Sequence, residues 1–158
     1  MERNTEQNIK KLVRVNLDAF EGYKTAADNV NDSLLNTFLN QCSNDRKNYA
    51  TALAEEINIT PEEISTHFKA DLHRVWIDLK TSPQRFSAKT VLRECKRGEK
   101  YTIETYDDII AGGSYPPTLE EQIKYQRSEI ISKYNRIIEM EKEYDQKDDK
   151  RNKQTSVP

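Results

Sequence analysis

Apolar residues recur every three or four positions along four long stretches of this chain, the spacing by which an α-helix buries a single face. Each stretch would form a helix of about 25 residues, extending roughly 37 Å. The stretches run over residues 6–29, 33–57, 87–112 and 117–144. Four Gly and five Pro are few for a protein built on β-turns. The sequence therefore predicts an all-α protein.

A shorter helix is predicted in the connection of residues 58–86. The motif TPEE at residues 60–63 combines a capping hydroxyl, a proline at the first helical position and a glutamate able to complete a capping box. We expect this helix to carry Trp76 on its apolar stripe and to end near Ser82 and Pro83.

Short loops join the first two long helices and the last two, so each pair should form an antiparallel hairpin. One long crossover between two hairpins is the connectivity of ferritin-like bundles. We predict a ferritin-like antiparallel four-helix bundle over residues 1–144, with the short crossover helix outside it. In this arrangement we expect helices 33–57 and 87–112 to run antiparallel. Residues 145–158 are charged and polar, and we expect a disordered tail there.

Composition narrows the classes of partner. The chain carries 25 basic and 27 acidic residues, with a formal net charge of −2, which disfavours nucleic acid. No stretch approaches the roughly 20 apolar residues of a membrane span, and residues 1–15 lack the apolar segment of a secretory signal. The two cysteines, Cys42 and Cys95, are isolated and fall on apolar stripes. We therefore expect a cytoplasmic protein that binds neither nucleic acid nor membrane.

Three segments resemble a bacterial family of helical proteins. They are EGY followed by two alanines within residues 21–27, LHRVWIDLK at residues 72–80, and LRECKRGE at residues 92–99. The second segment is the most specific, and the resemblance covers about residues 6–142. The family is catalogued as a domain of unknown function in the ferritin-like superfamily, which implies a four-helix bundle without an established activity.

A ferritin-type di-iron site needs a Glu from each of two helices and a Glu-x-x-His motif from each of the other two. Neither histidine, His67 or His73, follows a glutamate by three residues. Members of that family commonly carry a histidine where this chain has Asn135. Many of them carry a polar or acidic residue where this chain has Phe20, which we expect to point inward. We therefore predict no bound metal and no cofactor. The carboxylates left for an atypical metal site are Glu21, Glu99 and Glu129.

Two charged residues fall on the predicted apolar stripes. Arg46 and Glu99 each lie between a cysteine and a tyrosine on their helices, while Gln126 and Lys133 lie on or beside the last stripe. An isolated buried charge is costly, so each needs a partner. We predict that Arg46 and Glu99 form a buried pair across helices, with Gln126 nearby.

No arrangement of a nucleophile with a base, glycine-rich phosphate loop or zinc-ligand spacing is present in the sequence. The sequence therefore favours a non-catalytic helical module that binds a protein partner or self-associates. Two alternatives stay open: a metal-carboxylate protein that handles iron or oxygen, and a stress-related helper that acts through its charged exterior.

Overall fold

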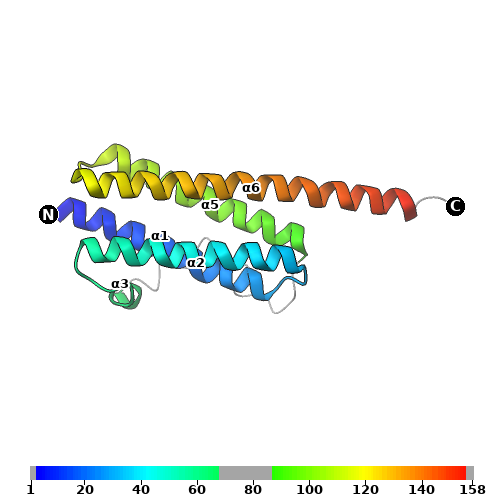
Figure 1. The fold of residues 1–158 in the computed structure, drawn as a ribbon, viewed down its shortest axis with the longest axis horizontal. Helices are drawn as coiled ribbons and strands as arrows, with labels where there is room; N and C mark the ends of the chain where they lie inside the picture. Colours follow the sequence, from blue (N-terminus) through cyan, green and yellow to red (C-terminus); the bar gives the residue numbers. More distant parts are fainter. Residues whose placement is uncertain (1–2, 68–86, 156–158) are drawn as a thin grey trace.

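The structure is a computed structural model that describes residues 3–67 and 87–155, and nearly all of these residues are helical. Figure 1 shows the long helices lying side by side, with a short helix against one end. Their bounds are α1 (Arg3–Asp28), α2 (Ser33–Glu56), α3 (Pro61–His67), α5 (Ala88–Gly112) and α6 (Pro117–Thr155). The all-α prediction is confirmed for the described residues.

Local capping explains where the helices begin. The carboxylate of Asp32 accepts a hydrogen bond from the Leu35 N–H at 3.0 Å and starts α2. The hydroxyl of Ser87 does the same for the Thr90 N–H at 3.2 Å and starts α5. These caps satisfy backbone donors that the first turn of a helix leaves without a partner.

The TPEE motif forms the predicted capping box at the start of α3. The Thr60 N–H donates to the Glu63 carboxylate at 3.2 Å, and the Glu63 N–H donates to the Thr60 hydroxyl at 3.4 Å. Ile64 is buried and packs with residues of the long helices. The remainder of the predicted crossover helix, with His73 and Trp76, lies outside the described residues.

The directions of the helices correct one prediction. In Figure 1, α1 and α6 run from left to right, whereas α2 and α5 run from right to left. Helices α2 and α5 are therefore parallel, not antiparallel as expected, because a crossover that returns along the full length restores the starting direction. Closest packing occurs between α1 and α2, α5 and α6, and α1 and α5, with a sparser contact between α2 and α6. Each of these pairs is antiparallel, and α2 faces α5 across the diagonal.

Helix α6 continues eleven residues beyond the expected end at residue 144, to Thr155. Figure 1 shows its last turns projecting past the other helices. The segment is rich in Lys, Arg and Gln, which favour helix as readily as apolar residues do, and an established helix extends at little cost. The polar composition of this segment indicates that it is not buried, and residues 146–153 are exposed. The same composition does not prevent the segment from forming a helix.

Two apolar clusters fill the interior toward opposite ends of the long helices. One cluster includes Ala19, Leu39, Leu92 and Ile137, and the other includes Leu12, Leu53, Ile109 and Ile123. Buried polar side chains occupy the layer between them. This layer contains the candidate site.

Candidate functional site

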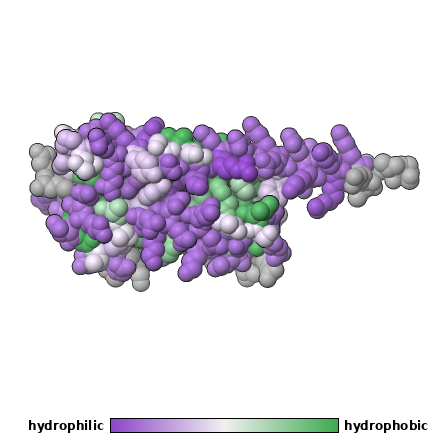
Figure 2. Space-filling view, viewed as in Figure 1, coloured by the Kyte–Doolittle hydropathy of each residue, from purple (hydrophilic) through white to green (hydrophobic). Residues whose placement is uncertain are grey.

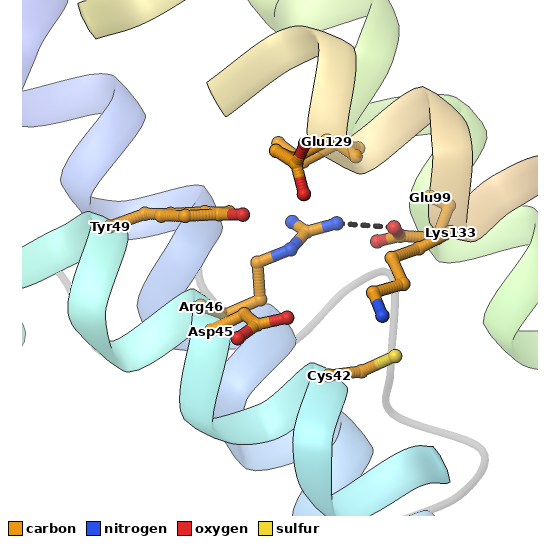
Figure 3. Close-up of a pocket in the computed structure, with 8 residues that line it drawn as sticks. Cys42, Asp45, Arg46, Tyr49, Glu99, Glu129 and Lys133 are labelled. Atoms are coloured by element: carbon orange, nitrogen blue, oxygen red, sulfur yellow. Dashed lines mark hydrogen bonds and ion pairs between the residues drawn. The ribbon is translucent and has the colours of Figure 1, made fainter. Parts of the chain in front are cut away.

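The centre of the polar layer is an ion pair between α2 and α5. The Nη2 atom of Arg46 donates to Oε2 of Glu99, and the two side chains are 2% and 0% exposed. Figure 3 shows the guanidinium extending from α2 toward the Glu99 carboxylate. The 3.6-residue period of each helix turns these residues inward, on the same stripes as Cys42 and Cys95.

Further hydrogen bonds connect this pair to the other two long helices. The Nη1 atom of Arg46 donates to the side-chain oxygen of Asn16 on α1 at 3.4 Å. The Asn16 amide then donates to the hydroxyl of Tyr106 on α5 at 2.7 Å. That hydroxyl donates in turn to the side-chain oxygen of Gln126 on α6 at 2.8 Å. We call Asn16, Arg46, Glu99, Tyr106 and Gln126 the polar network, and it joins all four long helices.

Burial sets the electrostatics of the ion pair. It raises the pKa of the Glu99 carboxyl, and the charge and hydrogen bond of Arg46 counteract that shift. Burial is the largest influence on Arg46 and lowers its pKa, but Glu99, together with Tyr23, Tyr106 and Cys42, more than compensates, so the pKa of the guanidinium is raised. A guanidinium keeps its proton throughout the physiological range, so a neutral Glu99 would leave a buried cation without a counter-charge. We therefore treat Glu99 as a negatively charged carboxylate and Arg46 as a positively charged guanidinium.

A shallow hollow lies over the ion pair at the sparse contact between α2 and α6. Figure 3 shows Tyr49 and Glu129 next to the guanidinium and Lys133 beside Glu99. The side chains fill this hollow so closely that no space for a water molecule is left. The lining residues are Cys42, Asp45, Arg46, Tyr49, Glu99, Glu129, Ile130 and Lys133.

The hollow is electrostatically unsuited to a metal ion as it stands. Its carboxylates, Asp45, Glu99 and Glu129, are accompanied by the cations of Arg46 and Lys133. A divalent ion would meet both cations, and the guanidinium already donates to one of the two carboxylate oxygens of Glu99. Among residues 3–67 and 87–155, no three His, Cys, Asp or Glu side chains are grouped so that they could hold a metal ion.

The predicted site residues divide between this layer and the surface. The structure brings Arg46 and Glu99 together, and it places Glu129 at the same hollow. Gln126 reaches the pair through Tyr106 and not directly. Glu21 is exposed on α1, away from the other two proposed carboxylate ligands.

Two further predictions concern residues beside this layer. Phe20 is only half-buried, with the Lys47 amino group 5.4 Å from its ring centroid, so the expectation that it points inward is wrong. The fully buried residues at this level are Ala19 and Tyr23, which share the buried face of α1 with Leu12 and Asn16. The side chain of His67 lies outside the described residues.

Sequence reasoning missed Asn16 and the polar role of Tyr106. Asn16 follows Leu12 by four residues and precedes Ala19 by three, so it shares their stripe and is completely buried. An amide at such a position needs a buried partner, and this signal is visible in the sequence. Tyr106 was read only as an apolar residue, although its hydroxyl also requires a partner when buried.

The two cysteines contribute packing and not reactivity. Both lie in the apolar cluster beside the ion pair. Burial raises the pKa of the Cys42 thiol to about 12, with the Glu99 charge adding to the effect, and burial also raises the pKa of Cys95. Since the thiolate is the nucleophile, these thiols are poor candidates for catalysis at neutral pH.

Comparison with known proteins adds one match. A family model described as a domain of unknown function (DUF2383) matches residues 4–112. This range contains α1, α2, α3 and α5, and therefore both members of the ion pair. No curated protein matches the chain.

Proposed function

The chain belongs to the DUF2383 family, a domain of unknown function, and we propose that it is a non-catalytic helical module that acts through its surface. The observation that supports this proposal is the closely filled space around Arg46 and Glu99. A catalytic or cofactor site requires a cavity, whereas here the guanidinium of Arg46 fills the centre and donates to both Asn16 and Glu99. The activity we propose is binding of a protein partner or self-association.

The finer architecture is part of this proposal. We infer a ferritin-like four-helix bundle over residues 1–144, in which a guanidinium takes the central position and no di-iron site forms. We further propose that residues 145–158 are an appendage to the bundle, that the protein is bacterial and cytoplasmic, and that it binds neither nucleic acid nor membrane. Among the described residues, no helix is long and apolar enough to cross a bilayer.

Exposed apolar side chains support a surface role. Figure 2 shows a mainly hydrophilic face interrupted by apolar patches. Leu34, next to the start of α2, is 82% exposed, and Tyr125 on α6 is 61% exposed. Single exposed apolar side chains are common on proteins, but tyrosine is enriched among the residues that anchor protein interfaces.

Sedimentation of the purified protein over a range of concentrations tests self-association. We expect a concentration-dependent increase in mass that Leu34→Asp or Tyr125→Asp weakens, because a charge placed in an apolar contact must be desolvated. The matched control is Lys124→Asp, an exposed change on α6 that should leave association unaffected. A monomer at every concentration would exclude self-association and leave only binding to a different protein.

Metal analysis tests the alternative that the module is a metal-carboxylate protein. The carboxylates at the hollow, Glu99, Glu129 and Asp45, are the observation that favours it. Protein purified from iron-supplemented culture should carry metal well below one ion per chain. Stoichiometric metal that Glu99→Gln removes would overturn the non-catalytic proposal and establish the alternative.

A further inference from the structure

A second hollow lies on the surface between α5 and α6, near the turn that joins them. Figure 1 shows these two helices side by side up to that turn. Unlike the filled hollow over the ion pair, this one is open to solvent and contains about 420 Å³ of space. Sites for small molecules measure roughly 300–1,000 Å³, so the space is large enough for a ligand. We call it the outer hollow, and it is lined by Asp107, Ile110, Ala111, Lys124 and Arg127.

One ion pair orients a guanidinium in the outer hollow. The Nε atom of Arg127 on α6 donates to Oδ1 of Asp107 on α5. Within residues 3–67 and 87–155, neither Nη1 nor Nη2 of Arg127 has a partner. A guanidinium carries its N–H donors in a rigid planar fork, so Asp107 engages one edge and leaves the donors of both Nη atoms for another acceptor.

The charges around this guanidinium suit an anion of low charge. Asp107 offsets one of the two cations in the lining, Arg127 and Lys124. The Nζ atom of Lys124 also lies 2.9 Å from the carboxylate of Glu120, one turn earlier on α6, in an exposed pair that water screens. Arg127 is therefore the cation with unused directional donors, while Lys124 adds only a weak positive field.

The other wall of the outer hollow is apolar. Ile110 is half-buried and Ala111 is exposed, and these two neighbours lie close to the end of α5. An apolar group placed over them would be removed from water, and this favours binding roughly in proportion to the area covered. The outer hollow thus presents a fork of donors beside an apolar wall.

We propose that the outer hollow binds a carboxylate attached to a short apolar group. The planar carboxylate accepts hydrogen bonds from Nη1 and Nη2 of Arg127, because its two oxygens match the spacing of the fork. The apolar group lies over Ile110 and Ala111. A doubly charged phosphate fits less well, since Asp107 and Glu120 offset most of the positive charge nearby. This site goes beyond the proposed function, which does not require it.

Titration with hexanoate, followed by ¹H–¹⁵N NMR, tests the site. Hexanoate combines a carboxylate with a short alkyl chain, and hexanamide is the neutral probe of the same length. We expect saturable shifts of the backbone amides of Ile110, Ala111 and Arg127, with a dissociation constant on the order of 1 mM. Hexanoate that gives no saturable shift there, or hexanamide that binds equally well, would overturn the proposal.

Two variants of α6 separate a specific site from a general attraction of anions. Arg127→Gln removes the fork and should weaken hexanoate binding about tenfold or more, because hydrogen bonds to charged groups are the strong ones. The matched control is Arg136→Gln, which removes a guanidinium of the same helix outside the outer hollow. It changes the net charge equally and should leave the affinity unchanged. Equal losses in the two variants would overturn the site.

Ala111→Glu tests the outer hollow with Arg127 intact. The added side chain occupies the space and repels a carboxylate, so hexanoate binding should be lost while the far-UV circular dichroism and the melting temperature stay close to those of wild type. The exposed position of Ala111 makes the change compatible with folding. Hexanoate that still binds this variant with wild-type affinity would show that the outer hollow is not the site.

A peptide arm distinguishes two sources of the same carboxylate. A free organic acid and an acidic side chain of a protein partner both present it, so hexanoate is compared with N-acetyl-Leu-Glu-Leu-amide. Tighter binding of the peptide, lost in Arg127→Gln, assigns the site to a protein segment, whereas tighter binding of hexanoate assigns it to free acids. Failure of both probes overturns the site but leaves the proposed function untouched, since sedimentation of the Leu34 and Tyr125 variants tests that function separately.

Discussion

The guanidinium of Arg46 on α2 is paired with the carboxylate of Glu99 on α5, across the diagonal of the four long helices. Both side chains are completely enclosed, in a layer between two apolar clusters. Buried ion pairs contribute little net stability relative to apolar packing, but removing one member is strongly destabilising. We therefore expect the pair to fix how the two hairpins align, since any packing in which the two charges do not meet would leave both of them unpaired.

Tyr106→Phe tests the outer part of the polar network. The change removes the hydroxyl that accepts from Asn16 and donates to Gln126, and it leaves the buried Gln126 oxygen without that donor. We expect a loss of about 1–3 kcal/mol in the free energy of unfolding, measured by urea denaturation. Tyr101→Phe, at an exposed position of the same helix, is the control and should change stability by less than about 0.5 kcal/mol. Equal effects of the two changes would contradict a structural role for the Tyr106 hydroxyl.

Gly113→Ala tests the turn between α5 and α6. A Cβ atom at this position would lie 2.4 Å from the hydroxyl oxygen of Tyr115, which donates to the carbonyl of Ile109. The ring would have to move, so we expect a loss of about 1–3 kcal/mol in thermal or chemical denaturation. A Cβ at Gly112 would meet nothing within 4 Å, and Gly112→Ala should be neutral or stabilising by up to about 1 kcal/mol. Similar losses at both positions would reject the steric explanation.

Asp32→Ala tests the cap of α2 and its pH dependence. The hydrogen bond from Tyr144, followed by that from the Leu35 N–H, lowers the pKa of Asp32 from its ordinary value of 3.8. A lowered pKa in the folded state stabilises the protein above the unfolded value, and this contribution is lost as the pH falls through the folded value. We expect the variant to lose about 1 kcal/mol at neutral pH, with the difference from wild type narrowing below pH 3.8. A difference that stays constant to about pH 2 would show that ionisation of Asp32 is not involved.

Local signals in the sequence predicted most helix starts and the inward direction of the central charges. The capping residue Ser87 and the TPEE motif act on neighbouring backbone groups, so their effect can be read without knowing the fold. Arg46 and Glu99 were located because the helical period fixes the direction of a side chain from its own helix alone. Their contact needed a second condition, that both helices face the same centre, and the structure supplies it.

Features that depend on several helices together were harder to predict. The long connection predicted from the sequence already implies that α2 and α5 are parallel, so the expected antiparallel course was a wrong deduction from it, and the observed directions of the helices correct it. The hydrogen bond between Asn16 and Tyr106 joins residues 90 positions apart, so only the packed structure identifies the partner. The end of α6 was misplaced because loss of apolar residues marks the end of burial, whereas helix continues to Thr155.

A double-mutant cycle on Arg46 and Glu99, measured by urea denaturation, tests the central account most directly. Glu99→Ala removes the fully buried carboxylate that is paired with Arg46 and should cost about 3–5 kcal/mol. Combining it with Arg46→Met replaces both charges by apolar groups, so the double variant should be more stable than Glu99→Ala alone. Because the two charges compensate each other, the two single losses should add to more than the loss of the double variant. Additive losses, with the double variant the least stable of all, would contradict the claim that these two charges depend on each other.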